Sequence, residues 1–453
     1  MRAPRGQPPV ELAMSSEGQA RATPPRLLVL LATLAAVRLA AHALFLPAYE
    51  GPDEMLHLGR VLAFAEGSPA EALRGVPLSG VTVASVRARP CGPVVAPSYG
   101  CPPYGSAPGL FNVVSVAPAL PAEPDRRNPE NNQPPLYYAF AGLLLRGIRS
   151  VGGSLWLSPD GGLLFARLLS AALAIAGVCL VAALSIVRES SRIAVAAFGA
   201  LSLPGAADSL ARCANDVAVF AWCALVLVAL ERRWRAGILL LLIACGPLLK
   251  LTALPVVVLA VATLWVRGAR LYSVAVATAS LTVFPVQRLL GWRWGGTWEL
   301  NRPLPPLDEG LTQLLGGLAH SAYTFVKTTF WLGGWSFLRP PRMLVVLFGL
   351  LLLAVASRFR LQRPALRAIP HVAAAGLAAA GFVMFAVASR RFFGGWGGVG
   401  GWYVWGWFPW LLAAAAVLVD RGGRWPAILS GAIGVFAVLA NVVYLAVAIP
   451  AYR

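Results

Sequence analysis

The stretch that decides the fold is LLVLLATLAAVRLAAHALFLP, residues 27–47, in which one arginine and one histidine interrupt an apolar run. A helix of this length and composition can cross the ~30 Å hydrocarbon core of a bilayer. Similar runs recur up to the C-terminus, and the whole chain is 58% hydrophobic and only 13% charged. This composition excludes an ordinary soluble globular protein and predicts an all-α polytopic membrane protein.

The residues before this run predict a separate tail. Residues 1–26 are rich in Pro, Ser and Arg and cannot pack a core, so we expect a disordered cytoplasmic tail followed by a single transmembrane domain over 27–453. An uncleaved first helix is favoured over a cleaved signal peptide, because the run is long and the later spans need an anchor of fixed orientation.

The remaining apolar runs predict about eleven transmembrane helices in total, with the N-terminus inside and the C-terminus outside. After the first run, the candidate spans lie at about 163–187, 193–207, 215–230, 237–250, 254–266, 272–288, 342–357, 369–388, 402–419 and 427–449. Several of them are short for a ~30 Å core at 1.5 Å per residue, which predicts broken or half-buried helices near the outer face.

The charge of the chain is explained by topology. The formal charge of +19 comes from 36 Arg and two Lys. The arginines gather in short connectors, as expected of cytoplasmic loops: these are Arg188 and Arg192, 232–235, Arg267 and Arg270, 358–367, and Arg421 and Arg424. The long loops 48–162 and 289–341 then lie outside. We therefore expect a multi-pass protein of the plasma (inner) membrane, with lipids and not nucleic acid as its charged partner.

The cysteines divide into two groups. Cys91 and Cys101 lie in the first long loop, outside the cytoplasm, where a disulfide can persist. Their spacing leaves open whether they pair. The other four lie in or beside apolar runs, where small core residues are expected: Cys179, Cys213, Cys223 and Cys245.

Directly after the first span comes YEGPDEMLHLGR, residues 49–60, in which Pro52 fits the first position of a helix and two acids occupy its first turn. The positive end of a helix dipole favours ionised carboxylates, so Asp53 and Glu54 suit a base or a cation-binding group. Helical spacing puts Asp53, His57 and Arg60 on one face. The apolar positions Met55, Leu58 and Leu62 are expected on the membrane surface. The alternative is that the two acids only begin an interfacial helix.

Further charged residues are predicted near the outer face. Arg38 lies inside the first span with His42 one turn above it, which suggests a polar cavity unless Arg38 snorkels to the headgroups. Arg212, Asp216 and Lys250 fall at the outer ends of later spans, where helix capping and snorkelling are the alternatives.

Aromatic residues favour the same side of the membrane. Asn131–Tyr138 introduces a second interfacial helix, with its tyrosines expected at headgroup level. Most outer tryptophans fit an aromatic belt: Trp292, Trp294, Trp298, Trp331, Trp335, Trp396, Trp402, Trp405, Trp407 and Trp410. The glycine-rich run 392–401 predicts a close backbone approach or a re-entrant turn.

The order of these elements resembles the GT-C fold glycosyltransferases, in particular poorly characterised bacterial relatives of protein mannosyltransferases and aminoarabinose transferases. The matching pieces are Asp53-Glu54 with His57, QPPLYY at 133–138, ARLLSAALAIAG at 166–177, Asn215-Asp216, LLKLTALP at 248–255, FVKTTFWLGGWSF at 325–337 and GGVGGWYVWGWFPWL at 397–411. The resemblance covers about residues 27–415. Each motif is weak alone, and their shared order is moderately specific.

The resemblance implies an inverting transfer of a sugar from a polyprenyl-phosphate donor to an extracytoplasmic acceptor in the cell envelope, a glycan, lipid or protein. Asp53 would be the general base, with Glu54 beside it, and Lys250 a phosphate contact. We expect Arg38, His57, Arg60, Arg212 and Asp216 to complete the substrate site. Many relatives have Arg-Tyr where this chain has Trp402-Tyr403, so Arg390 or Arg391 would have to replace that arginine.

No His/Cys cluster predicts zinc. A divalent cation between Asp53 or Glu54 and Asp216 stays open. The rival functions are a membrane transporter or lipid flippase, in which intramembrane charges line a pathway, and a non-catalytic subunit of envelope assembly. The residues identify neither the sugar nor the acceptor.

Overall fold

The computed structural model describes most of the chain. The described residues are 25–51, 53–88, 100, 124–126, 128–152, 154–187, 191–282, 285, 310–332, 338–357, 368–393, 395–396, 400–418 and 425–452. Cys91 and Cys101 lie outside them, as do four of the outer tryptophans, Trp292, Trp294, Trp298 and Trp335.

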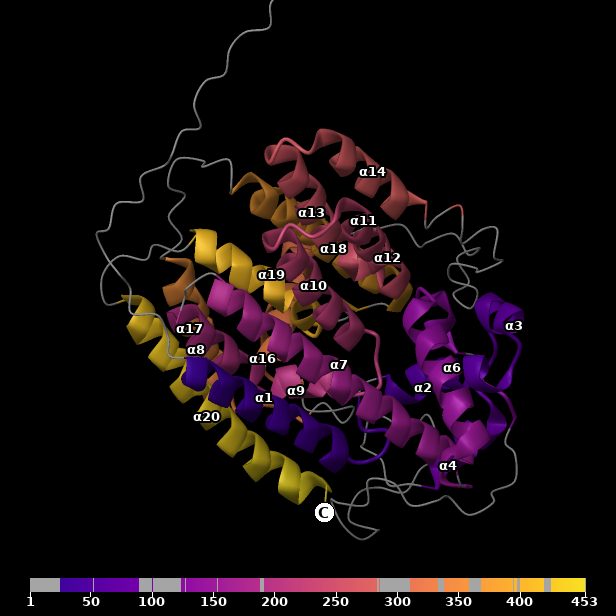
Figure 1. Cartoon of the computed structure of the whole chain (residues 1–453). Coiled ribbons are helices and arrows are strands. Elements are labelled where there is room, and N and C mark those ends of the chain that lie inside the picture. Colours follow the sequence, from indigo (N-terminus) through magenta and orange to yellow (C-terminus); the bar gives the residue numbers. More distant parts are fainter. Residues whose placement is uncertain are drawn as a thin grey trace, which may run out of the picture.

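The described part of the chain is built from helices, with one isolated bridge between Leu78 and Arg126 (Figure 1). Helices occupy the apolar runs: α1 (Pro25–Phe45), α7 (Pro159–Val187), α8 (Ser191–Leu201), α9 (Pro204–Leu210), α10 (Asp216–Glu231), α11 (Ala236–Ala244), α12 (Gly246–Leu249), α13 (Leu254–Val266), α14 (Arg270–Leu281), α17 (Arg342–Ala356), α18 (Ile369–Phe393), α19 (Tyr403–Leu418) and α20 (Trp425–Tyr452). In the part of the chain that the structure describes, four helices are long and apolar enough to cross a membrane: α1, α7, α18 and α20. The chain is thus a helical protein with four candidate spans, and the full number of eleven stays a prediction.

Two of the shorter runs are broken, as their length predicted. α8 ends at Leu201, and Pro204 then begins α9, because proline fits the first turn of a helix and cannot continue the preceding one. In the second case α11 is followed by α12 and by the short 3-10 turn η3 (Leu251–Ala253), with the extended residue Lys250 between them.

The first long loop folds into a helical layer beside α7 (Figure 1). It contains α2 (Glu54–Glu66), α3 (Pro69–Arg74), α4 (Gly80–Arg87), the 3-10 turns η1 (Pro129–Asn132) and η2 (Ser154–Leu157), and α6 (Leu136–Val151). α2 and α6 pack closely, since a Cβ at Gly142 would lie 2.7 Å from the carbonyl oxygen of Val61. The second long loop contains α16 (Leu311–Phe330), a helix in a region where the sequence predicted no span.

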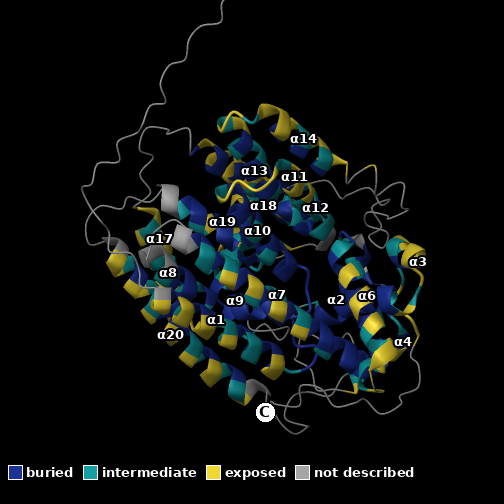
Figure 2. Ribbon diagram, viewed as in Figure 1, coloured by how far each residue is buried: buried dark blue, intermediate teal, exposed yellow. Residues whose placement is uncertain are grey.

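The position predicted for the apolar face of α2 is wrong. Met55, Leu58 and Leu62 are at most 4% exposed, because α6 and α7 cover them. Figure 2 shows α2 largely buried, whereas α1 and α20 carry many exposed positions. The loop helices therefore pack into the protein core through α2 and do not present this face to lipid.

Three of the outer tryptophans and Gly401 also pack into the core. Trp331, Trp405 and Trp410 are at most 2% exposed, so the belt prediction is wrong for them. The indole of Trp405 instead donates to the carbonyl oxygen of Thr329 at 3.0 Å. The close approach predicted for the glycine run is found at Gly401, where a Cβ would lie 2.3 Å from the carbonyl oxygen of Phe325.

Candidate active site

The turn after α1 is held in place by a buried ion pair. Glu54 accepts two hydrogen bonds from Arg167 of α7, with Nε to Oε1 at 2.7 Å and Nη2 to Oε2 at 2.6 Å, and neither side chain is exposed to solvent. Arg167 also donates to the carbonyl oxygens of Leu46 and Pro47 at 2.5 and 2.8 Å. Glu54 Oε1 accepts from the backbone N–H of Cys213 at 3.0 Å. This pair joins α2, α7 and the α9–α10 connection.

Asp53 differs from Glu54 in that its carboxylate is left free by the helix. α2 begins at Glu54, so Asp53 is the N-cap residue and does not lie in the first turn. Its backbone is left-handed, with φ 57° and ψ 10°, and its side chain makes no capping hydrogen bond. The left-handed region costs an L-residue ~1–2 kcal/mol, although Asp tolerates it better than most, and such strain gathers at functional sites. The Asp53 side chain therefore does not cap α2, although capping is the usual role of an N-cap residue.

The charges around Asp53 come from two later segments. Lys250 Nζ donates to Asp216 Oδ1 at 2.7 Å, and Arg212 Nη2 donates to Asp216 Oδ2 at 3.3 Å. Burial raises the pKa of Asp53, while the positive charges of Arg212 and Lys250 oppose this rise. Lys250 also lies 5.0 Å from the ring centre of Tyr403 on α19. The structure thus joins Arg212 and Lys250 to Asp216 and places them near enough to Asp53 to act on its charge, and their role as a substrate site stays a prediction.

Glu130 is a site residue that the sequence analysis missed. It lies in η1, where the side chain of Asn128 accepts from the Glu130 backbone N–H at 3.0 Å and donates to the carbonyl oxygen of Leu56 at 2.9 Å. Burial and the neighbouring charge of Asp53 raise the pKa of Glu130 to about 7. The signal was present in the sequence, because Asn-Pro-Glu at 128–130 is a capped first turn with an acid, much like the segment before α2.

His57 links Glu130 to the second loop helix. Its Nδ1 lies 2.7 Å from the hydroxyl of Tyr138 and 3.5 Å from Glu130 Oε2. Burial, with the positive charges of Arg212 and Lys250, lowers the pKa of His57 well below its usual value, so the ring is neutral at pH 7. Tyr137 and Tyr138 are at most 1% exposed, so their predicted position at headgroup level is wrong: α6 turns them into the core.

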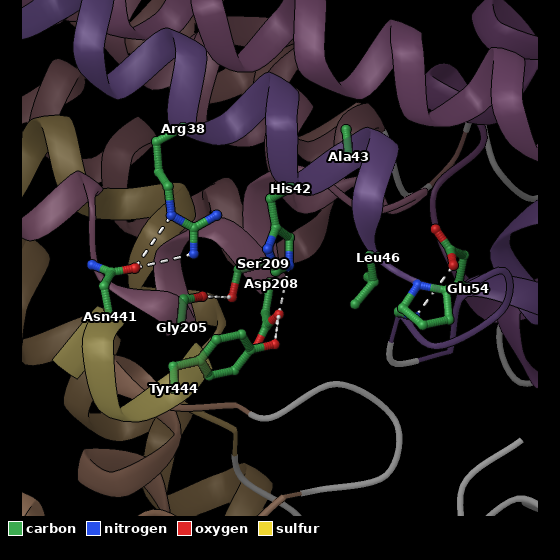
Figure 3. Close-up of polar contacts among 12 residues, drawn as sticks. Arg38, His42, Ala43, Leu46, Glu54, Gly205, Asp208, Ser209, Asn441 and Tyr444 are labelled. Carbon is green, nitrogen blue, oxygen red and sulfur yellow. Dashed lines mark hydrogen bonds and ion pairs between the residues drawn. The ribbon is translucent and has the colours of Figure 1, made fainter. Parts of the chain in front are cut away.

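Two predicted arginines serve other parts of the structure. Arg60 donates to Asn131 Oδ1 at 2.9 Å, and its guanidinium lies 5.4 Å from the ring centre of Tyr138, so it ties η1 and α6 to α2. Arg38 donates to Asn441 Oδ1 at 3.1 and 3.2 Å (Figure 3). Arg60 and Arg38 are thus held by contacts within the protein, and the phosphate contacts that we expected of them stay predictions.

A second buried polar cluster lies beside Arg38 (Figure 3). His42 Nε2 is 2.7 Å from Asp208 Oδ1, and the hydroxyl of Tyr444 donates to the same oxygen at 3.3 Å. The cluster joins α1, α9 and α20 and contains neither Asp53 nor Lys250. Arg390 and Arg391 lie in the last turn of α18, which packs on α13 and α16, and their expected contact with a donor phosphate stays a prediction.

Two of the three carboxylates proposed for a divalent cation, Glu54 and Asp216, are occupied by protein cations. Glu54 binds Arg167, and Asp216 binds Lys250 and Arg212. Among the residues that the structure describes, no three His, Cys, Asp or Glu side chains are arranged to hold a metal ion.

The raised pKa of Glu130 predicts a pH-dependent stability. The folded protein keeps a proton on Glu130 up to about pH 7, whereas the unfolded chain loses it near 4.5. The folded state therefore binds more protons between these values, and stability falls as the pH rises through this window, by on the order of 3 kcal/mol in full. Glu130→Gln removes this slope, so the melting temperature of the variant rises relative to wild type from pH 4.5 to 7.

Melting curves of the detergent-solubilised protein at several pH values measure this difference. Glu66→Gln, at an exposed glutamate of the same loop, is the matched control and should keep the wild-type slope. Parallel pH profiles for wild type and Glu130→Gln would show that Glu130 is ionised throughout.

The combination found here, a free carboxylate, a second carboxyl group that titrates near neutral pH and two buried cations, suits proton abstraction beside a bound anion. No family model, no curated protein and no solved structure matches the chain.

Proposed function

We propose that the chain is a membrane glycosyltransferase of GT-C type, which moves a sugar from a polyprenyl-phosphate carrier to an extracytoplasmic acceptor. The observation that carries the proposal is the position of Asp53. Its carboxylate has no capping role, whereas Glu54 and Asp216 are held by cations. The resemblance of the motifs and the eleven expected spans support the same function.

The reaction is a single displacement. Asp53 accepts the proton of the acceptor hydroxyl as its oxygen attacks the anomeric carbon, the bond from that carbon to the phosphate oxygen breaks, and the configuration inverts. The departing polyprenyl phosphate carries the negative charge that develops. Lys250 and Arg212 lie close enough to Asp53 to act on its pKa, so they would stabilise that charge in the same site. A protonated Glu130 would limit the repulsion of the incoming phosphate.

The direct test uses the purified full chain with labelled polyprenyl-phosphate sugars and cell-envelope acceptors. The proposed enzyme releases polyprenyl phosphate and forms a glycosidic bond. If none of a broad panel of donors is cleaved in the presence of acceptors, while the protein remains folded, the proposal is wrong.

The two lysines of the chain provide a sharper test. Lys250→Gln is expected to lower kcat/KM for the donor roughly tenfold to hundredfold, since a charge-assisted hydrogen bond contributes about 1.5–3 kcal/mol. Arg212 still pairs with Asp216 in this variant. Lys327→Gln, on the half-buried lysine of α16, is the matched control and should leave kcat/KM unchanged. Equal effects of the two substitutions would remove Lys250 from the phosphate site.

A transporter or lipid flippase is the second candidate, favoured by the buried cluster of His42, Asp208 and Tyr444 within the bundle (Figure 3). Ionisable groups at such positions often line a pathway for ions or substrates. A transporter would move its substrate across sealed vesicles without cleaving a glycosidic bond, whereas the proposed enzyme cleaves the bond in detergent as well.

A further inference from the structure

Two helices, α10 and α13, have a candidate site residue at or just before their first residue and arginines after their last residue. α10 begins at Asp216 and ends at Glu231, and α13 follows Lys250 and ends at Val266. α10 has 16 residues, so its two ends lie ~24 Å apart. The arginine-rich ends are those which the charge pattern assigns to the cytoplasmic side. A binding site at the arginine-rich ends of α10 and α13 is thus separate from the candidate active site.

The two helices end in the same type of turn, with different residues at the critical position. In α13 the N–H of Ala269 donates to the carbonyl oxygen of Leu264 at 2.9 Å across Gly268, whose φ is 82°. In α10 the N–H of Trp234 donates to the carbonyl oxygen of Ala229 at 3.0 Å across Arg233, whose φ is 51°. Glycine is the residue that favours this left-handed position. α10 has an arginine there despite the backbone strain.

A cavity of about 410 Å³ opens between these two helix ends. Arg233 and Arg267 line it together with Trp234, Tyr272 and several apolar side chains. Arg267 donates to the carbonyl oxygen of Leu230 at 2.7 Å, and its Nη2 lies 4.0 Å from Glu231 Oε2. Arg233 forms no hydrogen bond or ion pair with any residue that the structure describes. The cavity therefore has an arginine available for an anionic group.

The surroundings of the cavity are apolar and exposed. α11 and α14 pack on each other beside it, and Ile238, Leu241, Leu271 and Val274 on these helices are between 51% and 81% exposed. Trp234 and Tyr272, at the cavity itself, are residue types enriched at the level of lipid headgroups. An anionic group bound between the arginines would thus have an apolar surface next to it.

We propose that this cavity binds an anionic glycerophospholipid, with the phosphodiester on Arg233 and Arg267 and an acyl chain along α11 and α14. Two guanidinium groups match the charge and geometry of a phosphate. The exposed apolar side chains of α11 and α14 favour a lipid over free phosphate, because free phosphate has no acyl chain to pack against them.

Native mass spectrometry of the full-length protein with phosphatidylglycerol or phosphatidylcholine of identical acyl chains tests the proposal. Wild type should retain one phosphatidylglycerol in preference to phosphatidylcholine. Arg233→Gly should weaken this binding about fivefold, the usual contribution of one arginine near an anionic headgroup. Its melting temperature without added lipid should not fall, because glycine fits the left-handed position better than arginine does.

Arg270→Gln is the matched control. Arg270 lies at the same end of the bundle but stacks on Trp265 at 5.6 Å, outside the cavity lining, so this variant should bind the lipid as wild type does. Equal losses in both variants would mean that diffuse positive charge, not this cavity, attracts lipid. A wild-type protein that does not prefer phosphatidylglycerol, or that loses the lipid to millimolar inorganic phosphate, would also overturn the proposal. None of these measurements depends on glycosyltransferase activity.

Discussion

Asp53→Asn is expected to lower the turnover of sugar transfer by about 10²–10⁴-fold, the usual contribution of a positioned general base. The amide of asparagine has nearly the shape of the carboxylate but cannot accept the proton of the acceptor hydroxyl. The rate of polyprenyl phosphate release, measured at saturating donor and acceptor, gives the effect. Binding of the donor should change little, because Lys250 and Arg212 remain in place.

The backbone of Asp53 makes this variant a clean test. Asparagine, like aspartate, tolerates the left-handed conformation that Asp53 adopts, and the Asp53 side chain forms no capping hydrogen bond that the substitution would remove. The melting temperature should therefore match that of wild type. Wild-type turnover in Asp53→Asn would falsify the assignment of the base, and Glu130, 3.5 Å from His57, would then be the next carboxyl group to substitute.

Site residues next to an apolar run could be predicted from the sequence, whereas contacts between residues far apart in the chain could not. Asp53, Asp216 and Lys250 were identifiable because each follows or precedes an apolar run, so topology placed them on one side of the membrane. The structure brings Asp216 and Lys250 to 2.7 Å. Topology predicts on which side of the membrane a residue lies, but not which residue it contacts. The pairing of Glu54 with Arg167, 113 residues away, could therefore not be predicted.

The loop helices show the corresponding limit for packing. The apolar period of α2 correctly predicted a helix with an apolar face, but the period alone does not say whether lipid or protein covers that face, and the predicted membrane surface was wrong. Met55 and Tyr138 are covered by protein, because α2 and α6 pack on each other. Most helices were predictable from hydrophobic length, whereas α16, in which Gln313, His320 and Lys327 interrupt the apolar residues, was not.

Replacing one member of the Glu54–Arg167 pair is expected to destabilise the protein by about 3–5 kcal/mol, because it leaves the other charge buried and unpaired. Glu54→Gln leaves the Arg167 guanidinium without a counter-ion, and Arg167→Met leaves the carboxylate of Glu54 with only the backbone N–H groups of Gly51 and Cys213. The melting temperature and the yield of monodisperse protein in detergent measure the loss. Arg146→Met is a useful control, because Arg146 also donates to backbone carbonyls of the first loop but has no carboxylate partner among the residues that the structure describes.

The double variant Glu54→Gln/Arg167→Met separates the ion pair from catalysis. It contains no unpaired buried charge, so it should be more stable than Arg167→Met, with a coupling energy in the range of 0.5–3 kcal/mol that is typical of contacting residues. Recovery is incomplete, since the carbonyl oxygens of Leu46 and Pro47 lose their donor. If the folded double variant turns over substrate while Asp53→Asn does not, Glu54 is a positioning residue that holds the turn of Asp53. If both are equally inactive although the double variant is well folded, Glu54 takes part in the reaction, as its place beside Asp53 in the sequence first suggested.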